Sequence, residues 1–575
     1  MKEQIRDKAG LIILCLTLTA IAVLPFFYLG EVRGGGCCGG AMPVTHDGAM
    51  HLNQMQGFWR GLTSGRIYPR WDDLTHSGFG APLTSFYPPG VYYLTSLLFA
   101  FLRDWQRVQI SVNLILFALS GFVVYLYARQ RMGRVSSLLV MAIYIIAPYH
   151  LLNLYQRGAL AEQSGFIWMP LILLFADRLM EISPSLLNKK TMLNMAGLSA
   201  CFGAWLWMHP PTAYQMVLVF GLALLIYSGA AALMRKPDEP NIRGMISIII
   251  ALVFGTLPAA AYFYPAIFER NLINSDDIEI SWPYHASYVF DYDQKIYDRI
   301  NDRFFVRIDR IWALNLAVLL LAGLVVYLFR HRLKSESLKR GAWIWFLAGG
   351  LATFLMTRPS SFIGRLIPGI ETGVFSWRML TITSMTSALL AGLCFEISRK
   401  SKEKESGSIR LAGFAASIVI MAGTLVAGYQ LVVQPTYRVE AFRPRPDHFN
   451  FATLPKEVPK VVPTIERASL ISGKGIVGVE IWQPEYRKIV VNMESMGQLQ
   501  IRTSYFAGWA AMIDGQITQI STGNLNEILI NAPVGSHVIE LNFKTTPVRM
   551  AGNILSSASI GFLIMFVLFV KRRDR

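Results

Sequence analysis

Long blocks of apolar residues constrain the fold of this chain more than any other feature of its sequence. A helix of about 20 mostly apolar residues crosses the hydrocarbon core of a membrane. The blocks also explain the composition, which is 53% hydrophobic and 16% charged, with a mean hydropathy of +0.39. We predict a polytopic α-helical membrane protein with about 12 transmembrane helices. The predicted spans lie near residues 10–30, 108–128, 135–153, 163–181, 191–208, 211–234, 244–266, 310–329, 341–357, 378–397, 410–434 and 551–570.

One shorter apolar segment, Pro88–Leu102, decides the topology of everything that follows it. Basic residues favour the cytoplasmic ends of spans. If the segment does not span, seven basic clusters share the cytoplasmic side; if it spans, all but the first cluster move outside. We therefore predict a juxtamembrane or re-entrant helix and two cytoplasmic termini. The clusters are Lys2/Arg6/Lys8, Arg129/Arg131/Arg134, Arg178/Lys189/Lys190, Arg235/Lys236/Arg243, Arg330/Arg332/Lys334/Lys339/Arg340, Arg399/Lys400/Lys402/Lys404/Arg410 and Lys571/Arg572/Arg573/Arg575.

The formal net charge of +17 is explained by the same pattern. In a soluble protein such an excess would favour nucleic-acid binding. Here most of the basic residues lie at the ends of apolar blocks, so we predict no nucleic-acid partner.

The predicted topology places the long polar segments outside the cytoplasm. The last of them contains short runs of alternating apolar and polar residues separated by turn signals such as Asp514-Gly515, a pattern typical of a small antiparallel β domain. We predict a transmembrane domain over 1–434 with a long first external loop (31–87), an extracytoplasmic β domain over 435–550, and a final helix with a basic tail over 551–575. The alternating runs are Lys488–Asn492, Leu499–Ser504, Glu527–Ile530 and His537–Phe543.

The first external loop carries an aspartate, Asp47, at the start of a segment with helical periodicity. Such a residue is commonly a helix N-cap, and local sequence favours that interpretation. It could instead serve as a general base held at the membrane surface. His46 and His51 flank it, and a metal site is conceivable, although the spacing matches no strong metal motif.

Charged residues also mark later external segments. Arg157 and Glu162 lie in the short second loop. Arg157 could grip a phosphate in bidentate fashion while Glu162 orients it or shares a cation, or the two could simply form a pair at a helix end. Arg378 opens a later span on the external side, where it suits an anionic lipid group but could also extend to the headgroups. Glu269 ends another span.

Familiar motifs of other membrane and hydrolytic proteins are missing from the sequence. It has no Walker A loop, no GxSxG elbow and no HExxH helix. These absences argue against an ATP-driven pump, a serine hydrolase and a zinc protease.

Several short elements together resemble the GT-C membrane glycosyltransferases. The match is nearest to bacterial YfhO-like and 6-pyruvoyl-tetrahydropterin-synthase-related membrane proteins. The elements are Asp47…His51-Leu52, Pro69-Arg70-Trp71, Phe79-Gly80-Ala81-Pro82, Phe86-Tyr87-Pro88-Pro89, Arg157-Gly158-Ala159…Glu162, Phe375-Ser376-Trp377-Arg378 and Gly508-Trp509…Asp514-Gly515 with Gly535-Ser536-His537.

The resemblance implies a GT-C-like fold and transfer of a hexosyl or pentosyl group outside the cytoplasm. The donor would be a polyprenyl-phosphate-linked sugar in the bacterial cytoplasmic membrane, and the acceptor an envelope glycan, lipid or protein. A divalent metal is left open. Asp47 and Glu162 are the expected catalytic carboxylates, with Asp47 as the base, and the expected substrate-binding residues are His46, His51, Arg70, Arg157, Glu269 and Arg378.

Two other classes of function compete with this one. A transporter or flippase for lipid-linked glycans would usually show internal repeats and broken helices at matching places, and the sequence shows no repeat. A non-catalytic envelope assembly protein would use its β domain for docking and would not need Asp47.

Overall fold

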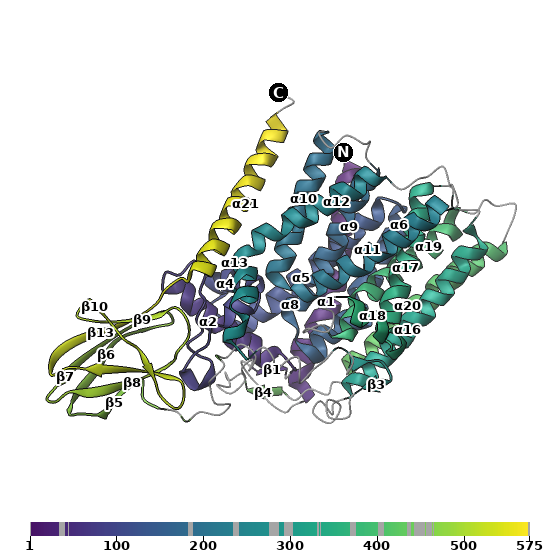
Figure 1. Ribbon diagram of the computed structural model, residues 1–575. Coiled ribbons are helices and arrows are strands. Elements are labelled where there is room, and N and C mark those ends of the chain that lie inside the picture. The colour runs from purple at the N-terminus through teal and green to yellow at the C-terminus, as the bar shows by residue number, and fades with distance from the viewer. Residues whose placement is uncertain are drawn as a thin grey trace.

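The computed structural model combines a bundle of long helices with a separate β domain at one end of it (Figure 1). It describes residues 2–33, 41–43, 45–181, 188–233, 241–274, 284, 287–292, 303–330, 333, 335–367, 375–400, 407–433, 439–441, 455, 463 and 465–572.

Each predicted span coincides with helical structure. These helices are α1 (Lys2–Arg33), α5 (Trp105–Arg129), α6 (Arg134–Ile145), α9 (Gly165–Glu181), α10 (Lys189–Met208), α11 (Pro210–Leu233), α12 (Ile242–Thr256) with α13 (Ala260–Phe268), α16 (Phe304–Leu328), α17 (Glu336–Leu355), α19 (Leu380–Lys400), α20 (Gly407–Val433) and α21 (Pro547–Arg572).

Within the described residues, eight helical segments are long and apolar enough to cross a membrane. They begin at Trp105, Arg134, Pro210, Ile242, Phe304, Ser376, Gly413 and Pro547. The other four predicted spans correspond to α1, α9, α10 and α17. Of these, α9 has only 17 residues, whereas α10 and α17 begin with charged side chains.

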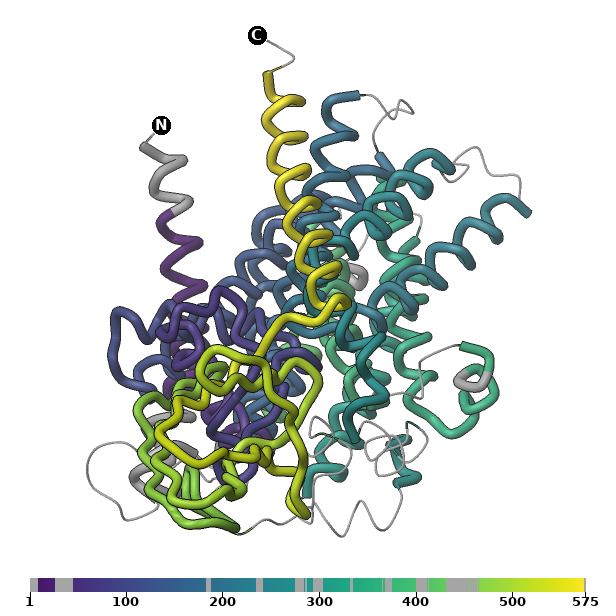
Figure 2. Tube along the Cα trace, turned by 60° about the vertical axis from the view of Figure 1, so that its left-hand side comes forward, coloured from purple at the N-terminus to yellow at the C-terminus, as the bar shows by residue number. Residues whose placement is uncertain are grey.

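Members of two of the predicted basic clusters, Arg131 and Arg340, lie close together at one end of the bundle. Arg131 pairs with Asp177, and Arg340 pairs with Glu181 at 3.4 Å, which joins the ends of α5, α9 and α17. The start of α1 and the end of α21 both lie at the end opposite the β domain (Figures 1 and 2). The segment Pro88–Leu102, which was predicted not to span, forms α4 (Gly90–Leu102). At 13 residues this helix is short for a span.

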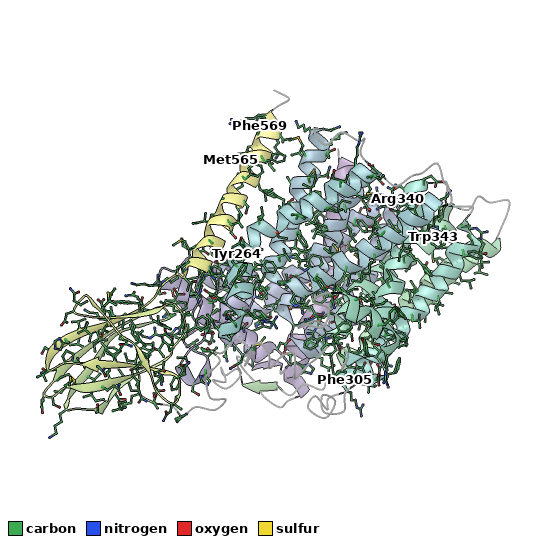
Figure 3. All side chains as sticks on the ribbon, viewed as in Figure 1. Tyr264, Phe305, Arg340, Trp343, Met565 and Phe569 are labelled. Atoms are coloured by element: carbon green, nitrogen blue, oxygen red, sulfur yellow. The ribbon has the colours of Figure 1, made fainter. Side chains whose placement is uncertain are left out.

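The last helix, α21, presents much of its apolar surface outward. Figure 3 labels Met565 and Phe569 on it, and these side chains are 65% and 64% exposed. Side chains of this kind suit contact with lipid tails, in agreement with a membrane-spanning helix.

Two antiparallel sheets form the β domain, as predicted. One has the strand order β10-β9-β13-β7-β6 and the other β11-β12-β8-β5. Side chains from both sheets, among them Ile489, Leu499 and Ile539, share one buried core, so the domain is a sandwich. Its strands are β5 (Ala468–Ser472), β6 (Gly475–Gln483), β7 (Tyr486–Met493), β8 (Gly497–Ser504), β9 (Trp509–Ile513), β10 (Gln516–Thr518), β11 (Ser521–Thr522), β12 (Glu527–Ala532) and β13 (Gly535–Phe543).

The β domain docks on the first loop, which is predicted to be external. The backbone N–H groups of Arg70 and Trp71 both donate to Oε1 of Glu485, at 2.6 and 3.3 Å. The Trp71 ring packs edge-on against Trp509, with centroids 5.3 Å apart, and belongs to the core of the sandwich. The loop and the β domain are therefore packed as one unit.

Candidate active site

Two loops that are predicted to be external are bonded side by side at the end of the bundle that carries the β domain. The N–H groups of His46 and Asp47 donate to the carbonyls of Gln156 and Arg157, at 3.0 and 2.8 Å. Gly158 takes a left-handed φ of +61°, and a Cβ there would lie 2.1 Å from Oγ1 of Thr45. Only glycine tolerates that conformation and that approach without strain.

Asp47 occupies the N-cap position of α2 (Gly48–Thr63), but its side chain makes no capping hydrogen bond to any described residue. Thr45 supplies the local acceptor instead, since its Oγ1 receives the N–H of Gly48 at 3.1 Å. The predicted N-cap position of Asp47 is therefore confirmed, but its side chain makes no capping bond within the described residues. Its carboxylate, 35% exposed, lies 3.9 Å from Nη2 of Arg157.

Behind Asp47, two arginines converge on one buried carboxylate. Glu162, on the short helix α8 (Leu160–Gln163), lies 2.5 Å from Arg157 and 3.1 Å from Arg378. Tyr149 donates to its other oxygen at 2.6 Å. The three charged side chains are 1%, 6% and 12% exposed, in the order Glu162, Arg157, Arg378. Buried charges persist only when they are paired in this way.

The electrostatics of Glu162 fit an orienting role better than proton transfer. Burial alone would raise the pKa of this carboxyl, but Arg157 and then Arg378 hold it well below its usual range. A general base works best with a pKa near the operating pH. Glu162 therefore stays ionised and fixes the two guanidinium groups, while Asp47 is the carboxylate with an open side.

The two histidines differ in environment. His46 is exposed and packs edge-on against Phe304, with ring centroids 5.3 Å apart. His51 is buried on α2, and its Nδ1 lies 2.9 Å from the hydroxyl of Tyr92. Burial lowers the pKa of His51 to about 4, with Asp47 opposing that shift. The His51 ring is therefore neutral at physiological pH.

This lowered pKa predicts a loss of stability in acid. The folded-state pKa of His51 is about 4 and the unfolded one about 6.5, so the stabilising contribution of the neutral ring is complete above pH 6.5 and falls as the pH drops toward 4. Thermal unfolding of wild type and His51→Gln, measured across this range, should show a shallower acid dependence for the variant. Parallel pH profiles for the two proteins would contradict this assignment.

Three neighbours of the cluster were not predicted from the sequence. Tyr149 and Asn153 precede Arg157 in steps of four residues, and Arg157 donates to Asn153 at 2.8 Å and to Tyr149 at 3.2 Å. That spacing is a helix-face signal that could have revealed them. His209 is buried as well, and its Nδ1 lies 2.9 Å from Oγ1 of Thr212. Burial, followed by the charge of Arg378, holds the pKa of His209 well below its usual range.

The cluster offers little to a metal ion. Among the residues that the structure describes, no three His, Cys, Asp or Glu side chains form a group that could hold one. Both oxygens of Glu162 already accept hydrogen bonds, from Tyr149 and from the two arginines. The side chains of this cluster therefore do not offer the set of ligands that a divalent cation needs.

Two of the predicted substrate-binding residues lie elsewhere, at the joint between the first loop and α21. Nη2 of Arg70 donates to the carbonyl of Ala261 at 3.1 Å and to Asn553 at 2.8 Å. Glu269 pairs with the fully buried Arg549 at 2.9 Å. These contacts hold α13, α21 and the loop together, and neither residue joins the cluster around Glu162.

Comparisons with known proteins give only distant likenesses. No family model matches the chain, and no curated protein does. Among solved structures, the oligosaccharyltransferase AglB from Archaeoglobus fulgidus, in complex with an inhibitory peptide and a dolichol-phosphate, has 12% identity and a TM-score of 0.44. The match covers 76% of this chain and 57% of AglB, so the chain spans little more than half of that enzyme.

A second likeness is to ArnT from Cupriavidus metallidurans. The apo structure has 11% identity and a TM-score of 0.42, covering 75% of this chain and 78% of ArnT. The structure bound to undecaprenyl phosphate has 11% identity and a TM-score of 0.38, with 74% and 73% covered. Because all these TM-scores are below 0.5, the function proposed next rests on the residues of the site.

Proposed function

We propose that this protein is a membrane glycosyltransferase of the GT-C type, related to the YfhO-like proteins. It moves a sugar from a polyprenyl-phosphate carrier to an acceptor on the extracytoplasmic side of a bacterial cytoplasmic membrane. One observation carries the proposal: the partly exposed carboxylate of Asp47 lies 3.9 Å from the guanidinium of Arg157, which shares a buried glutamate with Arg378. A base thus stands beside two cations suited to a phosphate.

The chemistry that suits this arrangement is an inverting displacement. Asp47 takes the proton of the acceptor hydroxyl while the oxygen of that hydroxyl bonds to the anomeric carbon of the sugar. The bond from that carbon to the phosphate oxygen breaks, and the polyprenyl phosphate leaves with the electron pair. Arg157 and Arg378 stabilise the charge that grows on the leaving phosphate. Glu162 keeps both guanidinium groups in place during the reaction.

The carrier-binding half of this proposal is tested with undecaprenyl phosphate and the purified protein in detergent. Arg378→Gln should weaken binding roughly 10- to 100-fold, because it removes charge-assisted hydrogen bonds worth about 1.5–3 kcal/mol. Arg358→Gln is the matched control, since Arg358 is also predicted to lie outside, is 76% exposed and pairs with Asp291. Equal affinities for wild type and Arg378→Gln would overturn the phosphate assignment and favour a docking protein.

A further inference from the structure

A second cluster of charges lies where the β domain meets the first loop. At its centre is Arg487 of β7, which is fully buried. Its guanidinium lies 4.3 Å from the Trp482 ring and 5.5 Å from the Trp509 ring, and Nη1 donates to the carbonyl of Tyr486. Its other two nitrogens, Nε and Nη2, are buried and have no hydrogen-bond partner in the described part of the chain.

Two more arginines form the outer part of this cluster. Arg502 of β8, which is half-buried, donates from Nη1 to the carbonyl of Ile465, and its buried Nε has no partner among the described residues. Its backbone N–H bonds to the carbonyl of Arg467, and the exposed Arg467 guanidinium lies 5.6 Å from the Trp482 ring. The loop approaches closely here, since a Cβ on Gly78 would lie 3.2 Å from Nε of Arg502.

Arginines outnumber carboxylates among the charges that act most strongly on Arg487. Asp73 of the first loop supplies the negative charge, and its Oδ2 pairs with Arg60 at 2.9 Å. Its Oδ1 is buried without a hydrogen-bond partner in the described residues. The charges that act most strongly on Arg487 are those of Asp73, which opposes the loss of its proton, and of Arg60, Arg467 and Arg502, which favour that loss.

The electrostatic consequence is visible in Arg487 itself. Burial lowers its pKa to about 9 against the opposing charge of Asp73, and the neighbouring arginines lower it as well. A buried N–H group without a partner is costly, and a buried charge more so. An anion beside the exposed Arg467 and the half-buried Arg502 would reduce the excess positive charge.

We propose that the arginine cluster formed by Arg467, Arg487 and Arg502, with Trp482 beside it, binds an acidic sugar unit of a glycan. A guanidinium fork matches the geometry of a carboxylate, and a half-buried tryptophan beside it can pack against a sugar ring. The β domain projects away from one end of the helical bundle and does not lie against its side (Figure 1). This position favours a glycan over a lipid headgroup as the ligand. The identification of this glycan as the acceptor rests on the proposed function. The binding of an acidic sugar by the arginine cluster does not depend on that function.

Binding is tested with the full-length protein in detergent, tetragalacturonate as the acidic probe and maltotetraose as the neutral one. Arg467→Gln and Arg502→Gln, both outside the buried core, should each weaken tetragalacturonate binding about 10-fold or more. Affinity should also fall as salt rises from about 50 to 200 mM. Lys488→Gln is the matched control, because Lys488 follows Arg487 on β7 but pairs with Glu480. This variant should bind tetragalacturonate as tightly as wild type does.

Three results would overturn the assignment: equal binding of maltotetraose, unchanged affinity in both arginine variants, or binding of inorganic phosphate alone. The last would mean an adventitious ion only. Asp47→Asn should bind tetragalacturonate like wild type. If the arginine cluster binds tetragalacturonate but Arg378→Gln leaves undecaprenyl phosphate binding unchanged, the transferase proposal fails and the acidic-sugar proposal stands. If Arg378→Gln weakens undecaprenyl phosphate binding but the cluster does not bind tetragalacturonate, only the acidic-sugar proposal fails.

Discussion

Replacing Asp47 by asparagine is expected to lower the rate of sugar transfer about 10²- to 10⁴-fold, the usual contribution of a general base. Asparagine keeps the shape of the side chain but cannot accept the acceptor's proton. The fold should survive, because the Asp47 side chain makes no capping bond to any described residue and is 35% exposed. The measurement is the initial rate of transfer from a labelled polyprenyl-phosphate sugar in proteoliposomes, divided by the amount of folded protein.

A second exposed aspartate on the predicted external side provides the control. Asp291 pairs with Arg358 at 3.4 Å, and its side chain is 45% exposed. Asp291→Asn should therefore transfer sugar at the wild-type rate. Full activity in Asp47→Asn, with wild-type amounts of folded protein, would exclude Asp47 as the base.

Glu162→Gln should produce the largest loss of stability. The neutral amide leaves Arg157 and Arg378 buried without the charge that both of them share. Breaking a buried ion pair from one side typically costs about 3–5 kcal/mol. Because the folded pKa of Glu162 is held below its unfolded value near 4.5, this contribution is complete above that pH and is lost only in stronger acid. Thermal unfolding at neutral pH measures the effect.

The matched control removes an uncharged group from the same cluster. Tyr149→Phe deletes one hydroxyl, which donates to Glu162 and accepts from Arg157, and should cost about 1.5–3 kcal/mol because both charged partners stay paired with each other. The two unfolding temperatures should therefore differ clearly, and Glu162→Gln should also bind undecaprenyl phosphate more weakly because its arginines lose their orientation. Equal unfolding temperatures for both variants would contradict the shared-glutamate arrangement.

Much of the fold could be predicted because a membrane demands that each spanning segment satisfy its own backbone hydrogen bonds. Departures occur where local geometry overrides composition. The span predicted over 135–153 breaks before Pro148, and a π-helical turn over Asn153–Arg157 follows. In the sandwich, β7 was visible because its burial alternates, whereas the edge strand β6 is largely exposed and gives no such pattern.

Residue types at the site could be read from the sequence, but their partners could not. A charged residue at a membrane boundary is a reasonable functional candidate. Arg378 and Glu162 meet across 216 residues of sequence, which no local spacing reveals. A charge at a membrane boundary was also the reason for choosing Arg70 and Glu269 as substrate-binding residues. In the fold these two residues contact Asn553 and Arg549, and the contacts form a structural joint.

That joint sets an order of events during synthesis. Arg70 and Glu269 are translated long before α21, yet their partners Asn553 and Arg549 lie on it. Until the ribosome has made that helix, the Glu269 carboxylate lacks its guanidinium and the loop that begins beside Asp47 is not fully anchored. A nascent chain that stalls before α21 would carry these unmatched charges at the membrane surface. The loop is therefore anchored to α21 only after that helix has been translated.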